Sequence, residues 1–390
     1  MASFGQLTLI ILAGLVGPLL AASPRLSVPV VVGELLAGVA LGRTGAGLVR
    51  ADNTTIAFLG NIGFAVLMMM AGMHVPLRNR ALLSDLRRGA IALLAAVALG
   101  LGGGLLIARG LGFGHPTIWA VLLSTGSAAI VLPAIEDAGI DADRAVLAMA
   151  WATVADVCTI VAVPLVMDPS KALRAGLGAV AVVLAAISIL LAARWLQRLA
   201  RVQVLRTDSA TRAWALDLRV SLLALFALCA LAQGLGISIM IAGFAAGLLV
   251  AVEGGPARLS EQVSGVAAGF LVPVFFVVLG AGLDVRALVQ SPKELELAAA
   301  LIAGIVVVHA VAGMAIRSPL WTSLGVSAQL GVPVSVVKLG TAGRLLSPGE
   351  GSAIIVAALA SLGICAAGAA LGRRQGRPAT PAAAPVATGA

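Results

Sequence analysis

One acidic residue stands alone in the middle of a long apolar stretch, a position that favours ion chemistry. Residues 146–166 are otherwise uncharged, and Asp156 lies at the centre of the stretch. A helix of this length crosses the ~30 Å hydrocarbon layer of a membrane. A carboxylate at that depth costs several kcal/mol and is by default a functional residue. Asp156 could bind a proton and a cation in turn.

The apolar stretch before Asp156, residues 118–135, is interrupted by polar and helix-breaking residues. These are Ser124, Thr125, Gly126, Ser127 and Pro133. Irregular backbone inside a membrane is tolerated where it lines a site, so Gly126 and Pro133 predict an unwound helix. The hydroxyls of Ser124, Thr125 and Ser127 would suit a hard cation. Alternatively, they bond to the backbone of their own helix.

The composition fits a helical membrane protein. Of the 390 residues, 60% are hydrophobic and 11% are charged, and the mean hydropathy is +1.08, whereas a soluble domain carries about 25% charged residues. Many small residues allow close helix packing. The net charge of +9 fits basic cytoplasmic loops rather than a nucleic-acid site. The three cysteines lie in apolar runs and predict neither a transition-metal site nor a cofactor.

Apolar runs separated by polar, Gly or Pro residues predict an all-α polytopic protein with about thirteen transmembrane helices. The expected spans are 5–22, 27–42, 54–74, 88–110, 116–138, 143–166, 172–197, 214–232, 236–252, 259–283, 294–316, 320–345 and 349–372. Residues 373–390 predict a disordered tail. Of the 26 Lys and Arg residues, eight fall on the N-terminal side of the membrane, 17 on the other, and Lys338 lies inside a helix. The N-terminus is therefore expected outside and the C-terminus in the cytoplasm.

Two motifs recur about 210 residues apart. Residues 33–38 match 242–247 at an offset of 209, and 71–75 match 281–285 at an offset of 210. Two six-helix units separated by a seventh helix must have opposite orientations in the membrane, which is the inverted-repeat plan of secondary transporters. Chance similarity between Gly/Ala-rich helices is the alternative.

The repeat also predicts a second broken helix, the counterpart of the one before Asp156. Gly331 and Pro333 mark its break. Two discontinuous helices that cross at the membrane midplane point dipole ends, roughly half a charge each, at one another. Asp156 can serve the positive ends, and the negative ends are expected to need a cation.

At these motifs the chain resembles the monovalent cation:proton antiporter family 2, the bacterial Na⁺/H⁺ and K⁺/H⁺ exchangers. Residues 28–38 are similar to the family's motif "P-x-x-x-G-E-x-x-A-G", and residues 63–72 to its third helix. Residues 241–248 and 270–282 resemble its "G-F-x-A-G-x-x-L" and "P-x-F-F-x-x-x-G" segments. The resemblance runs through nearly all of residues 5–372.

The resemblance implies an elevator-type antiporter, usually a homodimer, in the inner membrane of a bacterium. Residues 1–372 would form the membrane domain. It would comprise dimerisation helices at about 5–74 and 214–283, mobile core helices at about 88–166 and 294–372, and a linker helix at about 172–197. Any nucleotide-binding regulatory domain would have to come from a separate subunit.

The chain departs from the family in two places. The family commonly has two acids, or Asn-Asp, where this chain has Ala155 and Asp156, and a lysine where the nearest polar residue here is His309. Losing both an acid and its lysine partner keeps the charge balanced, as a working site with one carboxylate would require. His309 and Lys338 are candidates to replace the lysine. Alternatively, His309 is a packed residue and Lys338 extends to the membrane interface.

Three further acids have explanations other than direct ion binding at Asp156. Glu34 matches a family residue and is expected at a structural or domain-interface position. Glu136 ends a helix, where it could attract cations at the mouth of a funnel or simply be solvated. Glu350 follows Ser347 and Pro348, a spacing that predicts a capping box at the start of the last helix.

The leading prediction is a secondary active antiporter rather than an enzyme. It would exchange a monovalent cation for a proton, electroneutrally and through Asp156, and Na⁺ is a better candidate for this cation than K⁺. One alternative is a Na⁺-coupled symporter of an organic anion on a related fold, with Gln233 and Gln329 in the substrate pocket. The other is a membrane sensor or assembly component that transports nothing.

Overall fold

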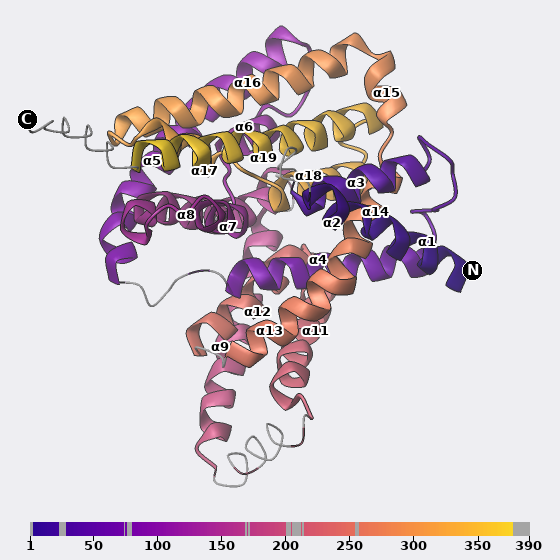
Figure 1. Cartoon of the computed structure of the whole chain (residues 1–390), viewed down its shortest axis with the longest axis vertical. Coiled ribbons are helices and arrows are strands. Elements are labelled where there is room, and N and C mark those ends of the chain that lie inside the picture. Colours follow the sequence, from indigo (N-terminus) through magenta and orange to yellow (C-terminus); the bar gives the residue numbers. More distant parts are fainter. Residues whose placement is uncertain are drawn as a thin grey trace, which may run out of the picture.

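The computed structural model describes residues 3–22, 29–73, 75, 80–167, 170, 172–199, 204, 212, 214–253 and 257–376. All regular elements in these residues are helices (Figure 1). The helices are α1 (Phe4–Gly14), α2 (Val16–Ala21), α3 (Val30–Leu41), α4 (Thr54–Met73), α5 (Arg80–Gly110), α6 (Pro116–Ser124), α7 (Ala128–Asp137), α8 (Ala142–Met167), α9 (Ala172–Gln197), α11 (Leu216–Leu235), α12 (Ile239–Glu253), α13 (Ala257–Val266), η2 (Ala267–Leu271), α14 (Val272–Gly282), α15 (Val285–Gln290), α16 (Pro292–Ala315), α17 (Leu320–Val326), α18 (Gly331–Ala342) and α19 (Pro348–Gly376).

The helices are apolar enough to cross a membrane several times. In the described part of the chain, ten helical segments have the necessary length and composition, and α3 and α12 are shorter apolar helices. Large apolar side chains cover the outside, such as Leu106 on α5, 74% exposed, and Leu173 on α9, 78% exposed. Lipid is the solvent that such a surface requires. The all-α, multi-pass prediction is therefore confirmed, whereas the number of spans stays a prediction.

Each predicted span coincides with a helix or with consecutive helices, although the bounds and details differ at several places. The tenth span contains a π-helical turn, Ala267–Leu271, just before Pro273. Proline has no N–H to donate to the turn before it, which favours such an irregularity. At the C-terminal end of the chain, α19 continues to Gly376. The prediction of a disordered tail from residue 373 is therefore wrong for residues 373–376. Residues 377–390 lie outside the described residues.

The helices pack in two groups (Figure 1). In the first, α4 packs on α12 and α14, α14 packs on α3, and α1 lies against both α3 and α14. In the second, α5 packs on α6, α8 and α16, while α19 packs on α16 and α17. Helix α9 contacts α8, α11 and α12 and so touches both groups. The two groups follow the predicted dimerisation and core segments, and the roles of these segments stay predictions.

Glycines bring the helices of the first group into backbone contact at two places. A Cβ atom on Gly38 of α3 would lie 2.3 Å from a carbonyl oxygen of α14, and one on Gly280 of α14 would lie 2.2 Å from α3. Equivalent contacts join α4 and α12 through Gly72 and Gly247. Gly38 and Gly247 are counterparts in the predicted repeat, and Gly280 is two residues from the counterpart of Gly72. The inverted repeat stays a prediction, which these paired contacts favour.

Candidate functional site

Two helices are interrupted, and their breaks touch. Helix α6 ends at Ser124 and α7 begins at Ala128, while α17 ends at Val326 and α18 begins at Gly331. The backbone N–H of Ser127 donates a hydrogen bond of 2.8 Å to the carbonyl of residue 328 in the other break. Both predicted breaks are confirmed, and they form one crossing.

The crossing depends on close backbone approach and on a buried amide. A Cβ atom on Gly126 would lie 2.5 Å from the carbonyl oxygen of Val326, so only glycine fits there without a shift. The side chain of Gln329 donates 2.8 Å to the carbonyl of Leu122, and its backbone N–H donates 3.1 Å to Ser361 Oγ. Gln329 therefore fastens one broken helix to the other, and its amide nitrogen is committed to backbone rather than to an organic substrate.

The two prolines lie beyond the breaks rather than in them. Pro333 is the third residue of α18, where the helix does not need its N–H. Pro133 is the sixth residue of α7, and its side chain lies outside the described part. The unwound backbone therefore comes from the residues around Gly126 and just before Gly331.

Asp156 meets the crossing at the start of α7. It lies on α8, is 5% exposed, and packs at the first turn of the half-helix. Its Oδ2 atom accepts a hydrogen bond of 3.1 Å from the backbone N–H of Ala128 and one of 3.3 Å from Ser127 Oγ. A helix N-terminus carries partial positive charge, so this position stabilises the carboxylate. Prediction and structure agree that Asp156 faces a broken helix.

The three predicted hydroxyls have different partners. Ser127 bonds to Asp156, and Thr125 Oγ1 lies 2.9 Å from the hydroxyl of Thr159, one turn along α8 from Asp156. Ser124 instead donates to the carbonyl of Ala120 in its own helix, at 2.9 Å. The structure thus brings Ser127 and Thr125 to the site and leaves the hydroxyl of Ser124 in the helix.

The two candidate charge partners lie in different places. His309 on α16 is completely buried beside the backbone of Thr125. Its Nδ1 lies 2.9 Å from the carbonyl of Ile305, and its ring stacks on that of Trp151 at 5.6 Å. Lys338 lies two turns along α18 and donates to Asn61. The structure brings His309, but not the Lys338 ammonium, to the crossing.

The remaining predicted acids lie elsewhere. Glu34 on α3 is 3% exposed, packs beside Gly17 and has no hydrogen-bond partner for Oε2 among the described residues. It belongs to the first helix group, away from Asp156. The side chain of Glu136 lies outside the described part of the chain.

Sequence reasoning missed two further polar residues near Asp156. Thr153 and Thr159 are each three residues from Asp156 on α8, and both are buried. Thr159 bonds to Thr125, whereas Thr153 Oγ1 has no hydrogen-bond partner in the described part of the molecule. Their spacing was the available signal, because residues three apart share a helix face.

Comparisons with known proteins agree on one family. The family described as "Sodium/hydrogen exchanger, transmembrane" matches residues 10–389. A putative Na⁺/H⁺ antiporter of Bacillus subtilis, YjbQ, is 22% identical over 92% of this chain and 62% of its own. The Na⁺/H⁺ antiporter NhaS5 of Synechocystis is 28% identical over 74% of this chain and 41% of its own. The chain thus spans less than two thirds of the length of either relative.

A solved structure shares the fold. The sodium/proton antiporter MjNhaP1 of Methanocaldococcus jannaschii superposes with a TM-score of 0.64 and 14% identity, over 95% of this chain and 98% of that one. The relatives are named as transporters, not enzymes. With nearly the whole sequence matched, the chain belongs to the sodium/hydrogen exchanger family of membrane proteins.

Proposed function

We propose that the protein exchanges a monovalent cation, Na⁺ in the first instance, for a proton across a bacterial inner membrane. The single observation that carries this proposal is the buried carboxylate of Asp156 at the start of α7. The hydroxyl of Ser127 bonds to this carboxylate and can serve as a further ligand, and the hydroxyl of Thr125 reaches Thr159, one turn away on α8. The names of the relatives support the same exchange.

Coupling follows from competition for one carboxylate. Asp156 holds either a proton or a cation, and in both loaded forms its charge is neutralised. The bare carboxylate is costly to move through the apolar layer, so only the loaded forms cross. One cation then moves against one proton, and the exchange is electroneutral.

Movement would involve the two helix groups. The second group carries Asp156 and the crossing, and the first group would stay fixed, in a homodimer, while α9 links them. Sliding of one group against the other would expose Asp156 to each side in turn. The N-terminus would lie outside and the C-terminus in the cytoplasm, as the distribution of basic residues favours.

The test is transport by purified protein in proteoliposomes. A pH gradient is followed with a fluorescent dye while Na⁺, K⁺ or Li⁺ is added. We expect Na⁺ to collapse the gradient and Asp156→Asn to abolish the response. Asp141→Asn is the matched control, because Asp141 is exposed before α8 and asparagine is an equally good helix cap.

Three outcomes would contradict the proposal. Exchange retained in Asp156→Asn would remove this residue from the mechanism. Uptake of a labelled organic acid that depends on Na⁺ would instead favour a symporter. No response to any of the three cations from correctly folded protein would favour a component that does not transport.

A further inference from the structure

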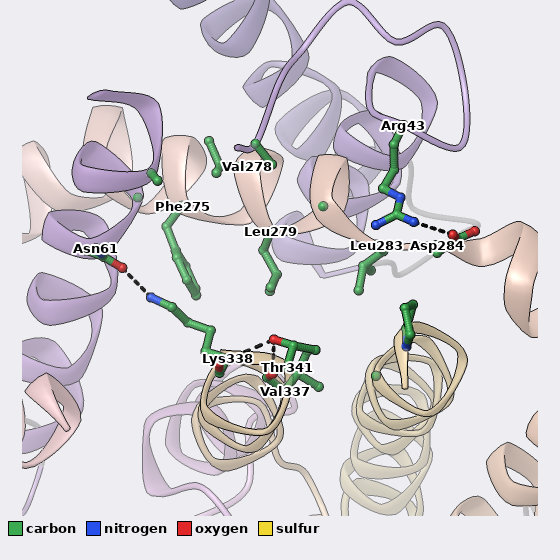
Figure 2. Close-up of a pocket in the computed structure, with 16 residues that line it drawn as sticks. Arg43, Asn61, Phe275, Val278, Leu279, Leu283, Asp284, Val337, Lys338 and Thr341 are labelled. Carbon is green, nitrogen blue, oxygen red and sulfur yellow. Dashed lines mark hydrogen bonds and ion pairs between the residues drawn. The ribbon is translucent and has the colours of Figure 1, made fainter. Parts of the chain in front are cut away.

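A second candidate site lies outside the crossing. A cavity of about 420 Å³ separates α4 and α14 from α18 and α19 (Figure 2). Its walls are mainly apolar, and its charged or polar side chains are Arg43, Asn61, Asp284, Lys338 and Thr341. Asp156 and the residues that bond to it do not line this cavity. It therefore needs an explanation of its own.

The mouth of the cavity, near Arg43 and Asp284, carries exposed charges, so we expect it to face water rather than lipid. Arg43 and Asp284 follow the ends of α3 and α14, and their side chains form an ion pair of 2.5 Å, 53% and 23% exposed. The Asp284 carboxyl also accepts the backbone N–H of Ala287, and this bond together with Arg43 holds its pKa below the usual value. The two charges at the mouth thus neutralise each other.

Lys338 leaves a positive charge uncompensated in the cavity wall. Its Nζ donates to Asn61 Oδ1 at 2.5 Å and lies 4.9 Å from the ring centre of Phe64 and 6.0 Å from that of Phe275. None of these partners is anionic, and no carboxylate forms an ion pair with Lys338 in the described part of the chain. A largely buried ammonium is costly without a counter-charge, and aromatic faces offset only part of that cost.

We propose that this cavity binds a small organic monoanion from the aqueous side, a carboxylate or sulfonate with an apolar body. Its charged group would pair with Lys338, and its body would lie along Phe275 and Leu279, whose side chains extend into the same space (Figure 2). The volume is within the range of small-molecule sites, which are mostly apolar with a few polar anchors.

Such a ligand would touch both helix groups. Asn61 and Phe275 belong to the first group, whereas Lys338 and Thr341 lie on α18, which starts at the crossing and packs on α8 and α19 of the second group. A bound anion would therefore hold α18 in the arrangement seen here. If the protein is an exchanger as proposed above, the anion slows exchange; binding itself does not depend on that function.

The test compares two probes of the same shape and opposite charge. Benzenesulfonate and benzyltrimethylammonium are titrated against purified protein in detergent while thermal unfolding is followed. We expect benzenesulfonate to raise the unfolding temperature with a saturable dependence, and the cation to do so much less, because a ligand that binds only folded protein stabilises it. Equal effects of the two probes would overturn the proposal.

Three variants locate the site. Lys338→Gln should raise the benzenesulfonate concentration that gives half of the maximal stabilisation by roughly 30-fold, as expected when one partner of a buried charge pair is removed. Lys293→Gln, an exposed lysine at the start of α16 that does not line the cavity, should change nothing. Gly282→Leu adds bulk at the cavity wall, where a Cβ atom would meet Ala51 at an ordinary contact distance of 3.6 Å, and should weaken binding with Lys338 intact.

Two results would refute the assignment. One is wild-type affinity for benzenesulfonate in Lys338→Gln. The other, decisive if Lys338→Gln does not fold, is wild-type affinity in Gly282→Leu. As a separate readout, benzenesulfonate should slow Na⁺ exchange by wild-type protein but not by folded Lys338→Gln. If the protein exchanges no cations at all, the binding measurement still tests the proposed anion site, because it does not depend on transport.

Discussion

The effect of a membrane voltage distinguishes one-for-one exchange through a single acid from exchange that moves an extra proton. Asp156 and Glu34 are the buried acids among the described residues, and of the two only Asp156 bonds to the crossing. One carboxylate that carries one cation or one proton moves no net charge. Voltage should then leave the equilibrium Na⁺ ratio unchanged. A second proton per cycle would add about 2.3 kcal/mol per 100 mV, which is about 50-fold in that ratio.

The measurement uses radioactive Na⁺ in proteoliposomes at a fixed pH gradient. The voltage comes from a gradient of thiocyanate, a permeant anion, because K⁺ is itself a candidate substrate. We expect the final Na⁺ ratio to agree within twofold with and without about 100 mV, whereas a two-proton exchanger would shift it by about 50-fold. Asp156→Asn liposomes provide the leak control.

A large voltage effect would refute the one-acid reasoning, and a variant would show where it fails. If Glu34→Gln removed the effect, Glu34 would be the carrier of the second proton despite its place on α3. If the effect survived Glu34→Gln, the extra charge would move through a group other than the two buried acids described.

Three changes test the packing of the crossing and of a helix cap by thermal unfolding in detergent. Gln329→Leu leaves the buried carbonyl of Leu122 without its donor and should cost about 1–3 kcal/mol; an unchanged unfolding temperature would contradict the role assigned to the amide. Gly126→Ala must move the carbonyl of Val326 and should cost about 1–3 kcal/mol, with slower exchange. Asp284→Ala removes the cap of α15 and should cost about 1 kcal/mol. Because the folded-state pKa of Asp284 is lowered, this difference is fully present above the unfolded-state pKa of about 3.9 and disappears as the pH falls from there through the folded-state pKa.

Local signals in the sequence predicted local structure well. Ser347 and Glu350 form the predicted capping box, with backbone-to-side-chain bonds of 2.6 and 3.1 Å. Gly126 marked a real break because a glycine among hydroxyl residues cannot continue an apolar helix at no cost. Hydropathy located the spans, since each must be apolar over its whole length.

Contacts between distant segments were not predictable from the same signals. Gln329 and Leu122 are 207 residues apart, and Asn61 and Lys338 are 277 apart. No periodicity or spacing joins such pairs, because only the folded packing brings them together. The sequence offered Gln329 as part of an organic-anion pocket, whereas in the structure its amide nitrogen donates to the backbone of Leu122.

The missing lysine and the single acid have a common physical explanation. The sequence predicts a cation at the negative ends of the half-helices. In the structure, however, neutral side chains donate hydrogen bonds to carbonyl groups at these ends. Gln329 Nε2 donates to Leu122, and Ser327 Oγ donates to Leu324 at 2.7 Å. His309 bonds within its own helix and need not be charged. No lysine or arginine among the described residues bonds to the crossing, so this site is neutral only when Asp156 holds one positive charge. The neutral donors thus take the place of a charged lysine at these carbonyls, which supports the one-for-one exchange proposed above.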